Sequence, residues 1–292
     1  MLKAFTKKIL QFLKLNIAFL LAFSHFACYN LIMFTFIYKD IDFAHKIDEA
    51  SNPTENYSKH IHPFNEIVLF ITGDVVYTVE TESRELQPGD IIFIPSGKYH
   101  FATVNSDSKY ERYVLKFPDT YLPDYIKEKR DLSSCFFGKA TQFLDVFKNF
   151  DELRKTYSDD ELYTTYLCET ILLLIKLYHT PTPMQKESDA LVNALIRYIN
   201  ENLENRITLD TLNQEFNFSK SYISNEFKTH MKTPIMHYIR TKKVLAAHKL
   251  ISNGVKTGQA AAQLGFADYS TFYRSYVKVM GFAPTDCEPS KT

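Results

Sequence analysis

Residues 264–284 read LGFADYSTFYRSYVKVMGFAP, and their pattern predicts the fold of the C-terminal part of the chain. The segment from Gly265 to Asp268 has the composition of a turn and separates two helical patterns, over residues 259–264 and 269–280. Phe272 and Tyr276 are four residues apart in the second pattern, so we expect both on the buried side of a helix. Most of the intervening positions are polar and predict an exposed outer face.

The same arrangement occurs once earlier in the chain. One short helix is expected to begin after Thr208, and Ser219 is expected to cap a second helix over residues 220–230. Helix, short turn and polar-faced helix form a helix-turn-helix, whose second helix lies in the major groove of DNA. A helix over residues 234–252 would join the two modules and fix their spacing near one turn of DNA, about 34 Å.

The distribution of charge supports this interpretation. The 292 residues include 34 basic and 34 acidic residues, so the net charge is zero. Residues 206–280, however, contain 11 basic against 4 acidic residues, so this region carries +7 and the remainder −7. Such a basic region predicts a polyanionic partner. The 4 cysteines are far apart and form no CxxC pair, which argues against a zinc knuckle or a disulfide framework and favours a reducing compartment.

Residues 33–118 have a different pattern, in which short apolar runs alternate with Gly and Pro turn signals. The runs at 66–72, 75–81, 91–94 and 110–117 predict an antiparallel β-barrel or sandwich.

Residues 119–180 have helical periodicity, with helices expected over 143–153 and 159–179. Their apolar stripes would either pack on the barrel or form a dimer contact, as a coupling segment. Prolines then predict a linker over 181–188, followed by an all-α double helix-turn-helix domain over 189–287. The expected fold class is α+β.

Four polar side chains of the barrel segment have a definite spacing: His60, His62, Glu66 and His100. His60 and His62 are two residues apart, so on a strand both side chains would lie on one face. This arrangement resembles the cupin family, whose barrels hold a divalent metal with such residues. Three interpretations remain open: the residues line an effector pocket, which we favour, bind a metal, or are purely structural. A pocket role implies no cofactor.

The C-terminal motifs together resemble the DNA-binding domain of AraC-type (AraC/XylS family) transcription regulators, which commonly carry a cupin-like sensor barrel. The positions that carry the resemblance are Ser219, Tyr222-Ile223, Phe227-Lys228, Tyr238-Ile239, Lys243, Ala247, Leu250, Leu264-Gly265-Phe266, Ser270-Thr271-Phe272-Tyr273-Arg274 and Gly281-Phe282-Ala283-Pro284.

The resemblance implies which residues contact DNA. Base-edge contacts are expected from Ser221, Ser224, Asn225, Tyr269, Ser270 and Arg274. Phosphate contacts are expected from Ser219, Lys220, Lys228 and Thr233.

The sequence departs from the family pattern at four positions. Thr257 and Ala260 are smaller than usual, Met231 replaces a usual glycine, and Cys287 replaces an aromatic residue. Because smaller residues bury less apolar surface, we expect the second module to contribute less to operator recognition.

The N-terminal residues 1–32 have no clear role. They are basic at first and then apolar, and the apolar stretch 15–38 is long enough for a membrane anchor. An upstream extension before a translation start at Met33 and an exported leader are the other interpretations.

The sequence as a whole predicts a cytoplasmic DNA-binding transcription regulator, not an enzyme. A small-molecule effector, such as a sugar or related metabolite, would bind in the barrel. The expected partners are double-stranded promoter DNA, a second copy in a homodimer, and RNA polymerase; activation and repression both stay open. The alternatives are a cupin metalloenzyme with an appended helical domain and a membrane-tethered regulator.

Overall fold

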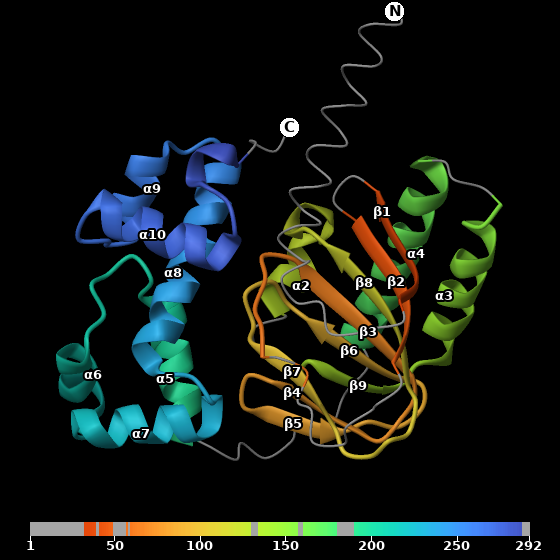
Figure 1. Cartoon of the computed structure of the whole chain (residues 1–292), viewed down its shortest axis with the longest axis horizontal. Helices are drawn as coiled ribbons and strands as arrows, with labels where there is room; N and C mark the ends of the chain where they lie inside the picture. The colour runs from red at the N-terminus through yellow and green to blue at the C-terminus, as the bar shows by residue number, and fades with distance from the viewer. Residues whose placement is uncertain are drawn as a thin grey trace, which may run out of the picture. The chain divides into compact units, whose positions relative to one another are not determined.

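The computed structural model describes residues 32–38, 41–48, 57, 59–129, 134–156, 160–179 and 190–287 (Figure 1). These residues divide into two compact units, one built mostly from residues 30–196 and the other mostly from residues 197–292. The predicted linker 181–188 and residues 1–31 of the N-terminal extension lie outside the described residues.

The N-terminal unit contains a six-stranded antiparallel sheet in the order β1-β2-β8-β3-β6-β9. Its strands are β1 (Ile32–Tyr38), β2 (Ile41–Asp48), β3 (Asn65–Thr72), β6 (Asp90–Ile94), β8 (Tyr110–Phe117) and β9 (Phe136–Lys139). The three strands of the smaller sheet, in the order β5-β4-β7, are β4 (Val75–Val79), β5 (Glu82–Glu85) and β7 (His100–Val104). Both sheets contribute to one apolar cluster, with Val68 and Phe70 from the large sheet and Val75 and Val104 from the small one. The predicted antiparallel β-barrel or sandwich is thus confirmed, as a sandwich of two sheets.

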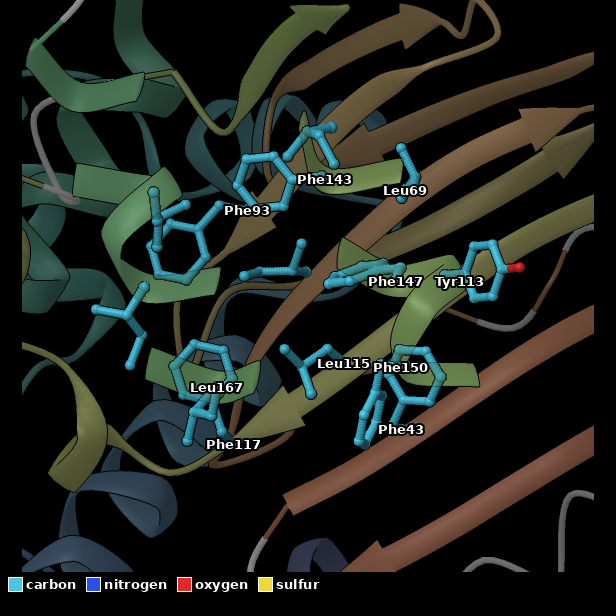
Figure 2. Packing of buried hydrophobic residues seen from close by; sticks show 14 of the residues in the cluster. Phe43, Leu69, Phe93, Tyr113, Leu115, Phe117, Phe143, Phe147, Phe150 and Leu167 are labelled. Carbon is cyan, nitrogen blue, oxygen red and sulfur yellow. The ribbon is translucent and has the colours of Figure 1, made fainter. Parts of the chain in front are cut away.

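Helices α3 (Thr141–Leu153) and α4 (Asp160–His179) cover the opposite face of the large sheet. Phe147 and Phe150 of α3 pack edge-on against Phe43 of β2, with ring centroids 5.5 and 4.6 Å apart (Figure 2). Leu167 of α4 belongs to the same buried cluster. The apolar stripes of the middle segment therefore form an intramolecular core.

Two expectations need correction. Residues 119–180 are not wholly helical, because β9 adds a strand to the edge of the large sheet beside β6. This segment also contains a short 3₁₀ turn, η1 (Asp119–Tyr121), and α2 (Asp124–Lys129). Residues 32–38 of the candidate membrane segment 15–38 are the strand β1, whose backbone is paired with β2. Within the described parts of the chain, no helix is long and apolar enough to span a bilayer.

The C-terminal helices are α5 (Ala190–Glu201), α6 (Leu209–Phe216), α7 (Lys220–Met231), α8 (Ile235–Ser252), α9 (Thr257–Gln263) and α10 (Tyr269–Met280), followed by the 3₁₀ turn η2 (Pro284–Asp286). Val244 and Ala247 of α8 pack with Leu264, Phe272 and Tyr276 in the core of the second module. Both predicted helix-turn-helix modules and the joining helix are present at nearly the expected bounds.

Candidate functional site

The first module begins with a well-capped helix. The Thr208 hydroxyl accepts from the Thr211 backbone N–H, and the Thr211 hydroxyl accepts from Thr208 N–H, which forms a capping box at the start of α6. The helix ends at Asn217, whose φ of 56° turns the chain into α7. Both predicted caps are confirmed, since the Ser219 hydroxyl accepts from Tyr222 N–H at 3.2 Å.

Helix α7 has one buried face and one polar face. Ile223 and Phe227 are fully buried, as expected. Ser221 and Asn225 are exposed, whereas Ser224 is half-buried. A helix oriented in this way can present Ser221 and Asn225 to a groove.

The predicted phosphate contacts lie around the ends of α7. Ser219, Lys220 and Lys228 are exposed and Thr233 is half-buried. The Lys220 ammonium forms an ion pair with Asp210 of α6. A phosphate would therefore compete with Asp210 for this ammonium, which makes Lys228 the stronger candidate.

The turn after α7 differs from the expected pattern. Met231 was expected to occupy the position of a usual glycine, but its side chain is fully buried. The residue in the left-handed conformation, which favours glycine, is Lys232 with a φ of 49°. Met231 continues the four-residue spacing of Ile223 and Phe227 and belongs to the inward face of α7, so the left-handed residue is its neighbour.

The second module repeats the design with a different cap. The Asp268 carboxylate accepts hydrogen bonds from the backbone N–H and the hydroxyl of Thr271 at 2.7 and 2.8 Å. These hydrogen bonds hold the pKa of Asp268 below its ordinary value. Tyr269, Ser270 and Arg274 are exposed on α10, as predicted.

Two aromatic side chains on these helices were not predicted from the sequence as DNA contacts. Tyr222 of α7 is 47% exposed and Tyr273 of α10 is 41% exposed. Tyr273 is four residues after Tyr269, and this helical spacing was the available signal. Both rings lie beside candidate base contacts in the sequence and offer apolar surface to thymine methyl groups.

A buried lysine connects the two modules. Lys243 of α8 is 6% exposed, and its ammonium donates to the carbonyls of Asn205 and Leu264 at 2.7 and 2.6 Å. Gly265 follows Leu264 with a φ of 64°, and a Cβ there would lie 3.1 Å from Glu204 O. The loop before α6 is therefore held against the turn before α10, which fixes the relative position of the two modules.

The space between the two sheets contains charged side chains as well as apolar ones. Asp42, Lys116 and Glu66 are direct cross-strand partners on β2, β8 and β3, so their side chains share one face of the sheet. Lys46 and Arg112 form a second cross-strand pair on the same face. These residues come from strands far apart in sequence.

The charges in this interior are largely matched. Arg112 donates to Asp48 at 2.6 Å and lies 4.0 Å from the centroid of the Tyr110 ring. Burial, together with Lys116 and Arg112, lowers the pKa of Lys46 to about 8. Burial raises the pKa of Asp42.

The structure brings His60, His62, Glu66 and His100 together at one end of this interior. One ligand atom from each of the four lies within 4.8 Å of the others. Glu66 is 5% exposed, and its Oε2 lies 2.8 Å from His62 Nε2 and 3.4 Å from Lys116 Nζ.

Burial and neighbouring charges set the protonation of this group. Burial alone would raise the pKa of Glu66. Lys116 and the nearby histidines nevertheless hold this pKa well below its ordinary value. Burial, assisted by Lys116, lowers the pKa of His62 to about 4. Burial and His100 lower the pKa of His60. At neutral pH the cluster thus contains a carboxylate beside at least two uncharged imidazoles.

A sandwich with a polar interior, followed by two helix-turn-helix modules, defines a class of DNA-binding regulators that respond to ligands. Residues 47–199 match the AraC-like ligand binding domain, and residues 212–288 match a helix-turn-helix domain. The chain therefore belongs to the AraC-type family of transcriptional regulators.

Individual relatives are distant. The HTH-type transcriptional activator RhaR of Enterobacter sp. (strain 638) is 21% identical over 253 residues, 80% of this chain and 87% of that protein. The transcriptional regulatory protein HptR of Staphylococcus aureus (strain bovine RF122 / ET3-1) is 28% identical over 104 residues, 35% of this chain and 41% of HptR. The crystal structure of ToxT from Vibrio cholerae O395 is 14% identical, with 85% of this chain and 97% of ToxT covered and a TM-score of 0.38.

Proposed function

We propose that this AraC-type regulator reads promoter DNA with α7 and α10 and changes its activity when a small molecule binds between its two sheets. The observation that carries the proposal is the pair of capped helices, each with a buried apolar face and an exposed polar face. Because its proposed target is chromosomal DNA, the protein is proposed to act in the cytoplasm.

Base recognition is assigned to the exposed side chains of the two helices. An Asn225 amide is suited to an adenine edge and an Arg274 guanidinium to a guanine edge, each with about 1–3 kcal/mol of discrimination. Ser221, Tyr269 and Ser270 are the other exposed candidates for base contacts. Ser224 is half-buried, so its contact with a base requires close approach of the DNA. The second module is still expected to contribute less than the first to operator recognition.

The test uses operator DNA found by genome-wide mapping of binding sites. Affinity measured by fluorescence anisotropy should fall steeply with salt, because bound phosphates release counterions. Asn225→Ala should weaken operator binding about 10-fold or more without affecting random DNA. Lys228→Ala should weaken both and reduce the salt slope by about 1.

A matched control is Lys148→Ala, which removes an exposed lysine of α3 in the other unit and should leave the salt slope unchanged. A complex that is neither salt-sensitive nor sequence-selective contradicts the proposal. If Arg274→Ala weakens operator binding more than Asn225→Ala does, the assignment of the second module as the minor contributor is wrong.

The effector is assigned to the charged interior, which the predicted pocket residues His60, His62, Glu66 and His100 line at one end. Asp42 Oδ1 and the Tyr110 hydroxyl are buried without a hydrogen-bond partner among the described residues, and Lys46 lies in the neighbouring cross-strand pair. Buried polar atoms of both signs suit a ligand with several hydroxyl groups, such as a sugar or a related metabolite.

A thermal-shift screen with neutral sugars and sugar acids tests this assignment. The ligand that stabilises the protein should lose its effect in Lys46→Met and keep it in Lys148→Met, the exposed control. Equal stabilisation of both variants would place the effector elsewhere.

The active species is proposed to be a homodimer that contacts RNA polymerase at the promoter. A dimer contact through α4 can be tested at Leu172, which is 65% exposed on the outer side of this helix. Leu172→Glu should shift the sedimentation coefficient to that of a monomer; an unchanged value would exclude this surface.

A further inference from the structure

Charge is unevenly distributed over the face of the large sheet that lies between the two sheets. Asp42, Lys116 and Glu66 form one cross-strand row, in which a cation lies between two carboxylates. Lys46 and Arg112 belong to a second row, in which two cations lie directly opposite each other. Like charges that face each other on neighbouring strands destabilise a sheet. The second row therefore lacks a compensating negative charge.

Only one of these two cations has an anionic partner. The Asp48 carboxylate accepts from Arg112 at 2.6 Å. Lys46 forms no ion pair or side-chain hydrogen bond among the described residues. The next residue of its row is Phe70 on β3, and Asp42, the other carboxylate of β2, is four residues away, about 13 Å along the strand. One net positive charge therefore remains around Lys46.

The side chains around Lys46 are suited to a carboxylate that also carries hydroxyl groups. The Arg112 guanidinium has five N–H donors in a planar fork, and Asp48 accepts from only its Nη1. Arg112 Cζ lies 4.0 and 5.5 Å from the ring centroids of Tyr110 and Tyr57, so these rings restrict the orientation of the fork. The buried Tyr110 hydroxyl has no hydrogen-bond partner among the described residues. Lys46 is half-buried and so keeps contact with solvent.

We propose that the effector is a sugar acid whose carboxylate binds Lys46 and Arg112. The inference rests on the proposed function and narrows the effector from sugars in general to anionic ones. A carboxylate neutralises the charge around Lys46 and accepts hydrogen bonds from both cations. A neutral sugar leaves that charge uncompensated, and an amino sugar adds to it. The hydroxyl groups of the ligand pair with the Tyr110 hydroxyl and with Asp42 Oδ1, which is also buried without a partner among the described residues.

The test compares neutral sugars with their acids by isothermal titration calorimetry of the full chain at neutral pH. D-glucose is paired with D-gluconate and D-glucuronate, and D-galactose with D-galacturonate. We expect at least one acid to bind at least about 10-fold more tightly than its neutral partner, because hydrogen bonds to charged groups contribute about this factor or more. Lys46→Met should weaken binding of that acid at least about 10-fold, whereas Lys46→Arg, which keeps the charge, should retain most of the affinity.

The stability of the free protein gives a second, independent measurement. Because Lys46 has no anionic partner and faces Arg112, Lys46→Met without ligand should unfold in urea at the wild-type concentration or above it. A lower midpoint would show that Lys46 stabilises the fold, and it would contradict the uncompensated charge on which the proposal depends.

Lys148→Met is the matched control, since it removes an exposed lysine of α3 and should leave acid binding unchanged. The sugar-acid proposal is overturned if no acid binds, if a neutral sugar binds as tightly as its acid, or if Lys46→Met binds the acid as the wild type does. A neutral sugar whose binding is weakened by Tyr110→Phe would overturn the sugar acid but keep the effector between the sheets, and so leave the proposed function intact.

Discussion

Two adjacent substitutions at the end of α7 should have opposite effects on stability. Met231→Gly removes a fully buried side chain at the end of the helix, whereas Lys232→Gly places glycine where the backbone φ is 49°. The family resemblance puts the usual glycine at residue 231, whereas the backbone conformation favours glycine at residue 232. The two substitutions therefore distinguish between these two expectations.

The expected magnitudes follow from burial and backbone conformation. Truncation of a buried methionine to alanine costs about 2–5 kcal/mol, and glycine in place of alanine adds about 1 kcal/mol. Met231→Gly should therefore destabilise the module by about 3–6 kcal/mol. A left-handed conformation costs an L-residue about 1–2 kcal/mol, and the greater freedom of glycine in the unfolded chain offsets part of this. Lys232→Gly should stabilise by about 0.5–1 kcal/mol.

Hydrogen exchange followed by mass spectrometry on the full-length chain measures both effects locally. Peptides that cover α7 and α8 should exchange at least about 100-fold faster in Met231→Gly, since about 1.4 kcal/mol corresponds to a factor of ten. The same peptides should exchange at the wild-type rate or slower in Lys232→Gly. Faster exchange in Lys232→Gly than in Met231→Gly would refute the assignment of the left-handed residue.

Three further predictions concern the contacts that hold each unit together. Lys243→Met leaves the carbonyls of Asn205 and Leu264 without their donor, so it should weaken binding to a full operator more than to a half-site, as measured by anisotropy; equal losses on both DNAs would contradict a role in fixing the spacing. Asp48→Ala leaves Arg112 buried and unpaired and should destabilise the N-terminal unit by about 3–5 kcal/mol in urea unfolding followed by circular dichroism, whereas a loss below about 1 kcal/mol would show that the pair is dispensable. Because the folded pKa of Asp268 is lowered, its stabilising effect is complete above the ordinary aspartate pKa of about 4 and is lost as the pH falls below it; amide exchange in α10 should accelerate there in the wild type and show no such step in Asp268→Asn.

Much of the C-terminal unit was predictable from the sequence because helices depend on neighbours three and four residues apart. Thr208, Ser219 and Asp268 act on backbone groups within three residues, so their sequence context was enough to place the helix starts. The left-handed conformation of Lys232 was not predicted. Both Met231 and Lys232 fit the local pattern, and only the packing of α7 decides which of them is buried.

The two helix-turn-helix modules, the joining helix and the approximate strands were therefore predictable from local patterns, because the periodicity of each element is local. The remaining features depend on the tertiary fold. Strand pairing placed Asp42, Lys116 and Glu66 side by side from three distant segments, and β9 beside β6. The fold also placed Nε2 of His62 and of His100 2.8 and 3.5 Å from Glu66 Oε2. Such arrangements depend on register and on contacts between residues far apart in the chain, which leave no periodic signal in the sequence.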